Sequence, residues 1–317
     1  MNTLINGIHH VTALAGDAQR NVDFYTGVLG LRMVKKTINF DAPDVYHFYY
    51  GDETGTPGSI ITFFPYGDIP RGRKGGGQLT YTAFSVPTAS LSYWMDRLAE
   101  YNIPYAGPNK RFNETYLRFE DYDGMGVELV ANNEDKRPGW ENGKIPVEYA
   151  VKGFHSATLN EFRVDKTIAL LTETMQHRLV AEEADRFRFV AGNGGPGTYI
   201  DVQHAPNDVR ALQGAGSVHH IAFATDNDET QLTIQENLRE AGFSPTPVLD
   251  RNYFHSIYFR EPGGILFEVA TNPPGFAIDE PLATLGQELK LPEWYEPRRS
   301  QIESALPKIT SLGNALD

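Results

Sequence analysis

The chain has 317 residues, 40% hydrophobic and 22% charged, which is enough for about two globular domains with cores of their own. Its formal net charge of −13 argues against nucleic acid and anionic membranes as partners, because both require a cationic surface. The absence of cysteine excludes disulfides, thiolate nucleophiles and cysteine-ligated metals, so any metal must bind to histidine and carboxylate side chains.

The N-terminal segment, MNTLINGIHH, lacks the basic stretch and long apolar run that mark a signal peptide. Apolar runs such as residues 60–64 are far too short to cross a bilayer. We therefore expect a cytoplasmic protein.

Four segments repeat one order of elements: an apolar strand, an amphipathic helix and further strands. Their openings are GIHHVTAL from Gly7, QLTYTAFSV from Gln78, KGFHSATL from Lys152 and SVHHIAFAT from Ser217. These starts are 71, 74 and 65 residues apart, a length that suits one supersecondary unit each. Aligned on the strand, the four openings place the following residues in one position: His10, Tyr81, His155 and His220.

The helix predicted after each opening is supported by apolar residues at helical spacing. The four stripes are Val22, Tyr25 and Leu29; Leu91, Met95 and Leu98; Ile168, Leu171 and Met175; and Ile234, Leu238 and Ala241. Gly30 and Gly242 are suitable stops for the first and fourth helices. Strands are expected next, for instance over residues 45–50 and 59–64 in the first unit.

The closing strands PGSIITFFP, DGMGVELVA, PGTYIDVQH and GGILFEVAT also align. Each has a turn glycine, and the residue four positions later falls at a fixed place on the strand. These residues are Thr62, Glu128, Asp201 and Glu268. The pattern predicts an α+β fold of four βαβββ units, with domains at 1–135 and 153–275, a polar linker at 136–152 and an irregular tail at 276–317. A short helix is expected near Gln301–Leu306.

Two packed units would close a cup around four inward positions, but spacing alone leaves open which units pair. Pairing of units one and four gives His10, Thr62, His220 and Glu268, which contains the two-histidine, one-carboxylate triad of non-haem iron oxygenases. Pairing of units three and four gives His155, Asp201, His220 and Glu268, a set suited to a Zn²⁺ or Ni²⁺ Lewis acid or, without Asp201, to a catechol dioxygenase. Units two and three would hold Tyr81, Glu128, His155 and Asp201, a weaker candidate for a second site. Glu268 lies on an apolar strand, and a buried carboxylate there requires a cation.

At the level of motifs, the chain resembles ring-cleaving dioxygenases of the hydroquinone 1,2-dioxygenase type, which belong to the vicinal-oxygen-chelate (glyoxalase/extradiol dioxygenase) superfamily. The matching segments are GIHHVTALAGDAQRNVDFYTGVLGLRMVKKT, VYHFYYGDETGTPGSIITFFP, SVHHIAFA and YFREPGGILFEVA, and the resemblance covers about residues 5–275. It implies two tandem domains with mixed, cup-like open barrels, and it favours the pairing of units one and four. The implied ligands of Fe(II) are His10, His220 and Glu268.

The same resemblance implies catalytic roles for Arg251, Tyr258 and His219 and substrate-binding roles for Thr12 and His9. Spacing supports two of these independently. Thr12 lies two residues beyond His10, on the same strand face. Tyr258 and Glu268 are each five residues from Gly263, so they face each other across a hairpin centred there.

The implied roles follow from side-chain chemistry. Arg251 would stabilise anionic oxygen and Tyr258 would hydrogen-bond the substrate. His219 would act as acid or base, because the ordinary histidine pKa lies near working pH. We expect water-excluding walls from Phe63, Phe223 and Phe254.

The function implied is Fe(II)-dependent, O₂-dependent cleavage of a hydroquinone-type aromatic ring, with a small aromatic and O₂ as partners. Mn(II) is an alternative ion, Zn(II) or Ni(II) can occupy such a site in purified protein, and a homo-oligomer is compatible with the sequence. Two enzymatic alternatives stay open: a glyoxalase-like metal-dependent lyase or isomerase, and a catechol extradiol dioxygenase that uses His155 as a ligand. A drug-binding protein without turnover is less compatible, because such proteins typically lack a complete triad.

Overall fold

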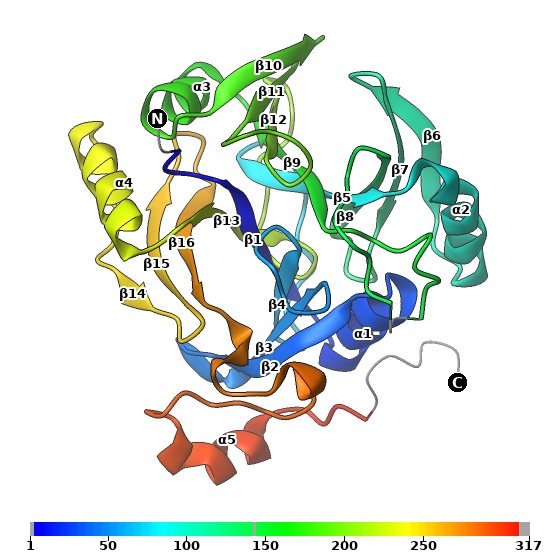
Figure 1. Ribbon diagram of the computed structural model, residues 1–317, viewed down its shortest axis with the longest axis vertical. Helices are drawn as coiled ribbons and strands as arrows, with labels where there is room; N and C mark the ends of the chain where they lie inside the picture. The colour runs from blue at the N-terminus through cyan, green and yellow to red at the C-terminus, as the bar shows by residue number, and fades with distance from the viewer. Residues whose placement is uncertain (1–2, 142–143, 311–317) are drawn as a thin grey trace.

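A computed structural model of the protein describes residues 3–141 and 144–310, which form two eight-stranded sheets (Figure 1). The first sheet has the order β14-β15-β16-β13-β1-β4-β3-β2. Its strands are β1 (Gly7–Ala15), β2 (Arg32–Asn39), β3 (Ala42–Gly51), β4 (Ile60–Pro65), β13 (Val218–Thr225), β14 (Leu249–Asp250), β15 (Phe254–Arg260) and β16 (Leu266–Pro274).

The second sheet has the order β10-β11-β12-β9-β5-β8-β7-β6. Its strands are β5 (Gln78–Val86), β6 (Tyr105–Arg111), β7 (Glu114–Glu120), β8 (Gly126–Ala131), β9 (Phe154–Glu161), β10 (Arg178–Glu183), β11 (Arg186–Val190) and β12 (Tyr199–His204). The two sheets have the same design, with two opening strands paired at the centre and the closing strands on either side.

One helix follows each opening strand, as the apolar stripes predict. These four helices are α1 (Ala18–Val22) with a π turn at Asp23–Val28, α2 (Leu91–Glu100), α3 (Asp165–Ala169) with a π turn at Leu170–Thr174, and α4 (Asp228–Glu240). A fifth helix, α5 (Arg299–Ala305), lies in the C-terminal tail. Short 3₁₀ turns occupy Thr88–Ser90, Phe276–Ile278, Leu282–Thr284 and Glu296–Arg298. Helix α2, for example, buries Trp94 and Leu98 in the hydrophobic core. In the part of the chain that the structure describes, no helix has the length and hydrophobicity needed to span a bilayer.

The pairing of the four units follows from the central strands of each sheet. β1 and β13 are antiparallel, with His10 opposite Ala222 and Thr12 opposite His220, so units one and four share the first sheet. β5 and β9 pair in the same way, so units two and three share the second. The predicted α+β fold of four units is confirmed, and the pairing of units three and four is wrong. Each sheet takes strands from both sides of the linker, and the domain boundaries at 135 and 153 stay a prediction.

The turn before each closing strand depends on glycine. Gly58, Gly124, Gly197 and Gly264 have φ values of 91°, 95°, 87° and 103°, which residues with a Cβ rarely adopt. Each closing strand then runs parallel to the opening strand of its own unit. This arrangement is what brings the fourth residue after the glycine to the centre of the sheet.

The strand register corrects one position in the sequence alignment. Glu268 lies beside Ala222, two residues beyond His220, whereas Asp201 lies beside Thr158, two residues beyond Ser156. Ser156, not His155, is therefore the counterpart of His220. Aligning the four strands on histidine shifted unit three by one residue, and a shift of one residue reverses the face of a strand.

Residues 276–310 of the C-terminal tail pack on the first sheet, beneath β2 and β3 in the view of Figure 1. Lys35 of β2 is fully buried, and its Nζ lies 2.6 Å from Asp279 and 2.8 Å from Glu280. The hydroxyl of Tyr46 donates to the carbonyl of Pro307 over 3.0 Å. α5 overlaps the helix predicted near Gln301–Leu306.

Candidate metal centre

The side chains of His10, His220 and Glu268 converge inside the first cup. His10 Nε2 lies 3.2 Å from His220 Nε2 and 3.3 Å from Glu268 Oε2, and the last two atoms are 2.9 Å apart. All three side chains are buried. They are the single group of three or more potential metal ligands found within residues 3–141 and 144–310.

This triangle has the dimensions of a metal site. Two bonds of about 2.1 Å that meet at a right angle separate their ligand atoms by about 3 Å, close to the three observed distances. Glu268 Oε2 is buried without a hydrogen-bond donor and faces two imidazole nitrogens. A cation at the centre would be coordinated by all three atoms.

The other side of each ligand is held by the protein. Glu268 Oε1 accepts a hydrogen bond from Ser256 Oγ of the neighbouring strand β15. His10 Nδ1 lies 2.9 Å from His9 Nδ1, and His220 Nδ1 lies 2.8 Å from His219 Nδ1. When the first histidine of each doublet accepts at Nδ1, the second must carry its proton there, which leaves Nε2 free to bind a metal.

Electrostatics at the site favour an anionic Glu268. Burial alone would raise the pKa of Glu268, but the adjacent His10 and His220 outweigh it and hold the pKa well below its ordinary value. Burial, with the neighbouring ligand histidine, lowers the pKa of His9 and of His219 to about 3. Burial also lowers the pKa of His220. The centre therefore carries a negative charge that a divalent cation would offset.

A cavity of about 390 Å³ opens onto this centre. Its lining includes both ligand histidines and an apolar wall formed by Phe40, Phe64, Phe254, Leu249 and Leu266. Its polar lining includes His47, Tyr49, His219, Arg251 and Tyr258. A monocyclic aromatic molecule fits a cavity of this size beside the metal position.

Arg251 and Tyr258 act as a pair in this lining. Arg251 Nε donates to the hydroxyl of Tyr258 over 3.2 Å, and Arg251 Nη1 lies 3.3 Å from the exposed Asp41. Tyr258 stands opposite Glu268 across β15 and β16, as the hairpin spacing predicts. Burial, and then the Glu268 carboxylate, raise the pKa of Tyr258 above its ordinary value. The hydroxyl thus keeps its proton and can donate it as a hydrogen bond toward the cavity.

His47 and Tyr49 line the cavity but were missed in the sequence. His47 Nε2 lies 2.9 Å from Thr62 Oγ1, and His47 Nδ1 lies 2.9 Å from the Tyr49 hydroxyl. Burial, reinforced by the ligand histidines and Arg251, lowers the pKa of His47 well below its ordinary value. The available signal was the segment VYHFYY, in which side chains with a polar group recur at every second position. His47 and Tyr49 are two residues apart and therefore share one strand face.

Two other predicted positions, Thr12 and His9, lie outside the cavity lining. Thr12 Oγ1 bonds Thr62 Oγ1 at 2.7 Å, so it supports His47 indirectly through Thr62. His9 is buried behind His10, with its ring 5.0 Å from that of Phe254. The substrate-binding roles of Thr12 and His9 stay predictions, but neither side chain lines the cavity. His219 does line it, yet a pKa of about 3 removes the reason given for an acid–base role.

Two of the predicted wall residues are wrong. Phe63 and Phe223 are fully buried in the hydrophobic core and do not line the cavity, whereas Phe254 does. Since strand residues alternate between faces, Thr62 and Phe64 face the cup while Phe63 points away from it. The same alternation separates Phe223 from His220, three residues earlier.

The alternative that uses His155 as a ligand is also wrong. His155 lies on β9 of the second sheet, and its Nε2 contacts Glu114 Oε1 at 3.1 Å. The centre instead places Thr62 at the fourth inward position of the first cup, where its hydroxyl bonds Thr12 and His47. That position supplies no strong metal ligand.

The chain is similar to known proteins over most of its length. The family model of the Glyoxalase/Bleomycin resistance protein/Dioxygenase superfamily matches residues 7–129 and 153–269. A protein of Bacillus subtilis (strain 168) named MhqO, provisionally assigned as a ring-cleaving dioxygenase, is 47% identical over 300 residues, 95% of either chain. The chlorohydroquinone/hydroquinone 1,2-dioxygenase of Sphingobium indicum is 33% identical over 306 residues, 94% of this chain and 95% of that one.

The chain is also similar to solved structures. The crystal structure of a provisionally assigned dioxygenase from Bacillus subtilis has a TM-score of 0.92 and 46% identity, covering 96% of this chain and 97% of that one. Glyoxalase I from Zea mays has a TM-score of 0.64 at 14% identity, covering 89% and 97% of the two chains. The second similarity is one of fold alone.

Proposed function

Because this chain belongs to the glyoxalase/bleomycin resistance protein/dioxygenase superfamily and is a dioxygenase, we propose that it cleaves the ring of a hydroquinone-type aromatic with O₂ and Fe(II). The observation that carries the proposal is the triangle of His10 Nε2, His220 Nε2 and Glu268 Oε2, with edges of 2.9 to 3.3 Å beside a cavity of ring size. Two imidazoles and one carboxylate leave up to three coordination positions of an octahedral ion free. A substrate and O₂ both require such positions.

Fe(II) at this centre would supply adjacent sites for the substrate hydroxyl and O₂ and a path for electrons between them. The chain's own residues have three tasks beyond holding the ion. They orient the ring, offer hydrogen bonds to its oxygens and keep bulk water out.

Arg251 and Tyr258 are suited to the reacting oxygens. Arg251 occupies the acceptor side of the Tyr258 hydroxyl, so the phenolic proton of Tyr258 is available to a substrate or oxygen atom in the cavity. The guanidinium adds a fixed positive charge where anionic oxygen would develop. The proposed division is therefore donation by Tyr258 and electrostatic stabilisation by Arg251.

Tyr49 and His47 are suited to a substrate hydroxyl. A neutral His47 can donate from Nδ1 to Tyr49 while Nε2 accepts from Thr62, or the hydrogen bonds can run in the opposite sense. In the first arrangement the Tyr49 hydroxyl is free to donate, and in the second its oxygen is free to accept. We propose that this pair binds the substrate whether its hydroxyl is protonated or ionised.

The test is reconstitution of the protein with Fe(II) without oxygen, followed by oxygen-electrode traces with hydroquinones, catechols and the methylglyoxal–glutathione adduct. We expect hydroquinone to consume one O₂ per ring opened, with both atoms of ¹⁸O₂ recovered in the product. His220→Gln should abolish uptake, whereas His255→Gln, at an exposed histidine of the same sheet, should retain it. Failure of every phenol to consume O₂ would refute the proposal, and O₂-independent conversion of the adduct would favour the glyoxalase-like alternative.

A further inference from the structure

The second cup has the same design as the first but different residues at its inward positions. The register of β5, β8, β9 and β12 places Tyr81, Glu128, Ser156 and Asp201 where the first cup has His10, Thr62, His220 and Glu268. Tyrosine and serine replace the two imidazoles, so this cup lacks the ligands that hold a divalent ion. Its two buried carboxylates still require positive charge.

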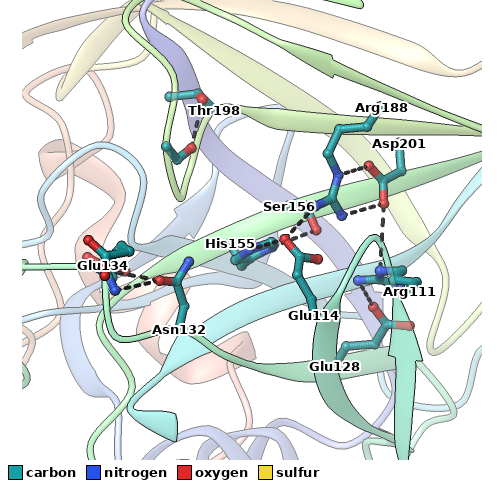
Figure 2. A network of polar contacts seen from close by, with 12 residues as sticks. Arg111, Glu114, Glu128, Asn132, Glu134, His155, Ser156, Arg188, Thr198 and Asp201 are labelled. Atoms are coloured by element: carbon teal, nitrogen blue, oxygen red, sulfur yellow. Dashed lines mark hydrogen bonds and ion pairs between the residues drawn. The ribbon is translucent and has the colours of Figure 1, made fainter. Parts of the chain in front are cut away.

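Arginine side chains supply that charge (Figure 2). Arg111 Nη2 lies 2.5 Å from Glu128 Oε2, and Arg118 binds Glu128 Oε1 through Nε at 2.9 Å and Nη2 at 2.6 Å. Arg188 makes a two-pronged contact with Asp201, from Nε at 2.7 Å and Nη2 at 2.9 Å.

Arg186 contributes the fourth guanidinium, with Nη1 located 3.2 Å from Asp201 Oδ2. The third carboxylate of the cluster is Glu114, 2.5 Å from Arg188 Nη1 and 3.1 Å from His155 Nε2. Burial would raise the pKa of Glu114, but His155 and Arg188 hold it at about 2, so this carboxylate is ionised. Four guanidinium groups thus face three carboxylates in the cluster, which leaves one positive charge in excess.

Two of these guanidiniums reach a cavity at the mouth of the cup. This cavity measures about 350 Å³, and Arg118 and Arg186 line it together with Lys74, Tyr81 and polar strand residues. Arg118 and Arg186 are 30% and 14% exposed, whereas the carboxylates that anchor them, Glu128 and Asp201, are fully buried. The anchors fix both guanidiniums before any ligand arrives, which lowers the entropic cost of binding.

Both guanidiniums have donors left over. Arg118 Nη1 makes no hydrogen bond within the described part of the chain, and Arg118 Cζ lies over the Tyr81 ring, 3.9 Å from its centre. Arg186 uses Nη1 alone, for Thr158 and Asp201, so its Nε and Nη2 groups make no hydrogen bond to any described residue. A guanidinium binds carboxylates through such a pair of parallel N–H groups.

Acidic groups near the cavity already have partners. Asp208, at the exposed rim, accepts from Asn160 Nδ2 at 2.5 Å and from the Val209 amide at 2.8 Å. Glu120 lies 2.6 Å from Lys74 Nζ. Asp208 is the single acid in the lining, against the three cations Lys74, Arg118 and Arg186. The carboxylates that pair with these cations, Glu120, Glu128 and Asp201, lie outside the lining.

We propose that this cavity binds a small organic carboxylate, held by the free N–H groups of Arg186 and Arg118. The hydroxyl and amide groups of Thr158, Asn160 and Gln203 favour a polar molecule over an aromatic one. The site is separate from the metal centre, because the two lie in different sheets. The inference does not depend on the reaction proposed for the first cup.

Isothermal titration calorimetry of the full-length protein with succinate, acetate and inorganic phosphate, at constant ionic strength, tests the proposal. We expect succinate to bind one site per chain, and Arg186→Gln to weaken it by roughly 10- to 100-fold, as for the loss of a charged hydrogen bond. Arg239→Gln, on the exposed face of α4, is the matched control and should bind like the wild type. Asp208→Asn should tighten binding by roughly 1.5- to 5-fold, because it removes the one acid of the lining.

Two further variants separate the site from its alternatives. His220→Ala should leave succinate binding unchanged, whereas carboxylate bound at the metal centre would be lost with that ligand. Arg186→Lys keeps a positive charge beside Asp201 but removes the paired N–H groups of the guanidinium. Weakened binding in this variant would therefore not reflect misfolding. The proposal is overturned if neither carboxylate binds, if phosphate alone binds, or if Arg186→Gln and Asp208→Asn both match the wild type.

Discussion

Replacing His9 tests whether the first histidine of each doublet positions the ligand behind it. His9 is 2% exposed, lies 2.9 Å from His10 Nδ1 and does not line the substrate cavity. In a His9→Leu variant, His10 Nδ1 loses its acceptor. His10 must then bury an unpaired N–H or move its proton to Nε2, where it would block the metal.

The cost of either outcome can be worked from the structure. A buried donor without a partner costs about 1–3 kcal/mol, which is a factor of roughly 5 to 150 in an equilibrium constant. Outer partners of metal-bound histidines typically contribute 10- to 100-fold in affinity. We therefore expect His9→Leu to weaken Fe(II) binding by roughly 10- to 100-fold.

The assay is anaerobic competition for Fe(II) against a chelator of known affinity, with oxygen uptake measured at saturating metal. His9→Asn is the rescue variant, since its side-chain carbonyl can accept from His10 Nδ1 where leucine cannot. We expect His9→Asn to bind Fe(II) within about threefold of the wild type, and saturating Fe(II) to restore much of the activity of His9→Leu. Equal affinities of His9→Leu and the wild type, or equal weakening by leucine and asparagine, would refute the reasoning.

Three other variants test different parts of the protein. Tyr49→Phe removes a hydrogen bond to the substrate, so KM for hydroquinone should rise roughly 2- to 13-fold with a smaller change in kcat; an unchanged KM would contradict the role of Tyr49. Lys35→Ala leaves Glu280 buried without its cation, so urea unfolding should show a loss of about 3–5 kcal/mol, and a loss near zero would contradict it. Burial and the nearby Glu261 carboxylate raise the pKa of Glu161 to about 8, so the folded state retains a proton that the unfolded state loses near pH 4.5. Wild-type stability should then fall as pH rises from about 5 to 8, and Glu161→Gln should lack that slope in thermal unfolding; parallel pH profiles would refute the assignment.

The parts of the fold that were predictable rest on backbone requirements. A glycine with positive φ is needed at each of the four turns, and the residue four positions later must then lie at the centre of its sheet. The spacing therefore fixed Thr62 and Glu268 as inward positions before any pairing of strands was known. The alignment of the opening strands placed the second histidine of each doublet at the other inward position, and the resemblance favoured the pairing of units one and four. β1 paired with β13 brings the two histidines together.

The parts that failed depend on strand register and on contacts between distant strands. The alignment of the third unit was shifted by one residue, which put His155 in the position of Ser156. Phe63 and Phe64 are adjacent on one strand and therefore face opposite sides of the sheet, so Phe64 lines the cavity and Phe63 does not. His47 becomes part of the cavity because β3 and β4 pair beside the centre, bringing it to Thr62. The alternation in VYHFYY places His47 and Tyr49 on one strand face, but which residues that face meets depends on tertiary packing. The arginines of the second cup come from β6, β7 and β11, which the repeat pattern does not single out.

The crosswise pairing of units has a consequence for how the chain could be divided. A cut in the segment between β8 and β9 would yield two pieces of similar size, one carrying His10 and the other His220 and Glu268. Neither piece could assemble a cup by itself, because each central strand pair, β1 with β13 and β5 with β9, would be severed. Each cup can form only when the two pieces associate, because both central strand pairs join one piece to the other. This scaffold is therefore suited to a split reporter, whose signal requires the two fragments to associate.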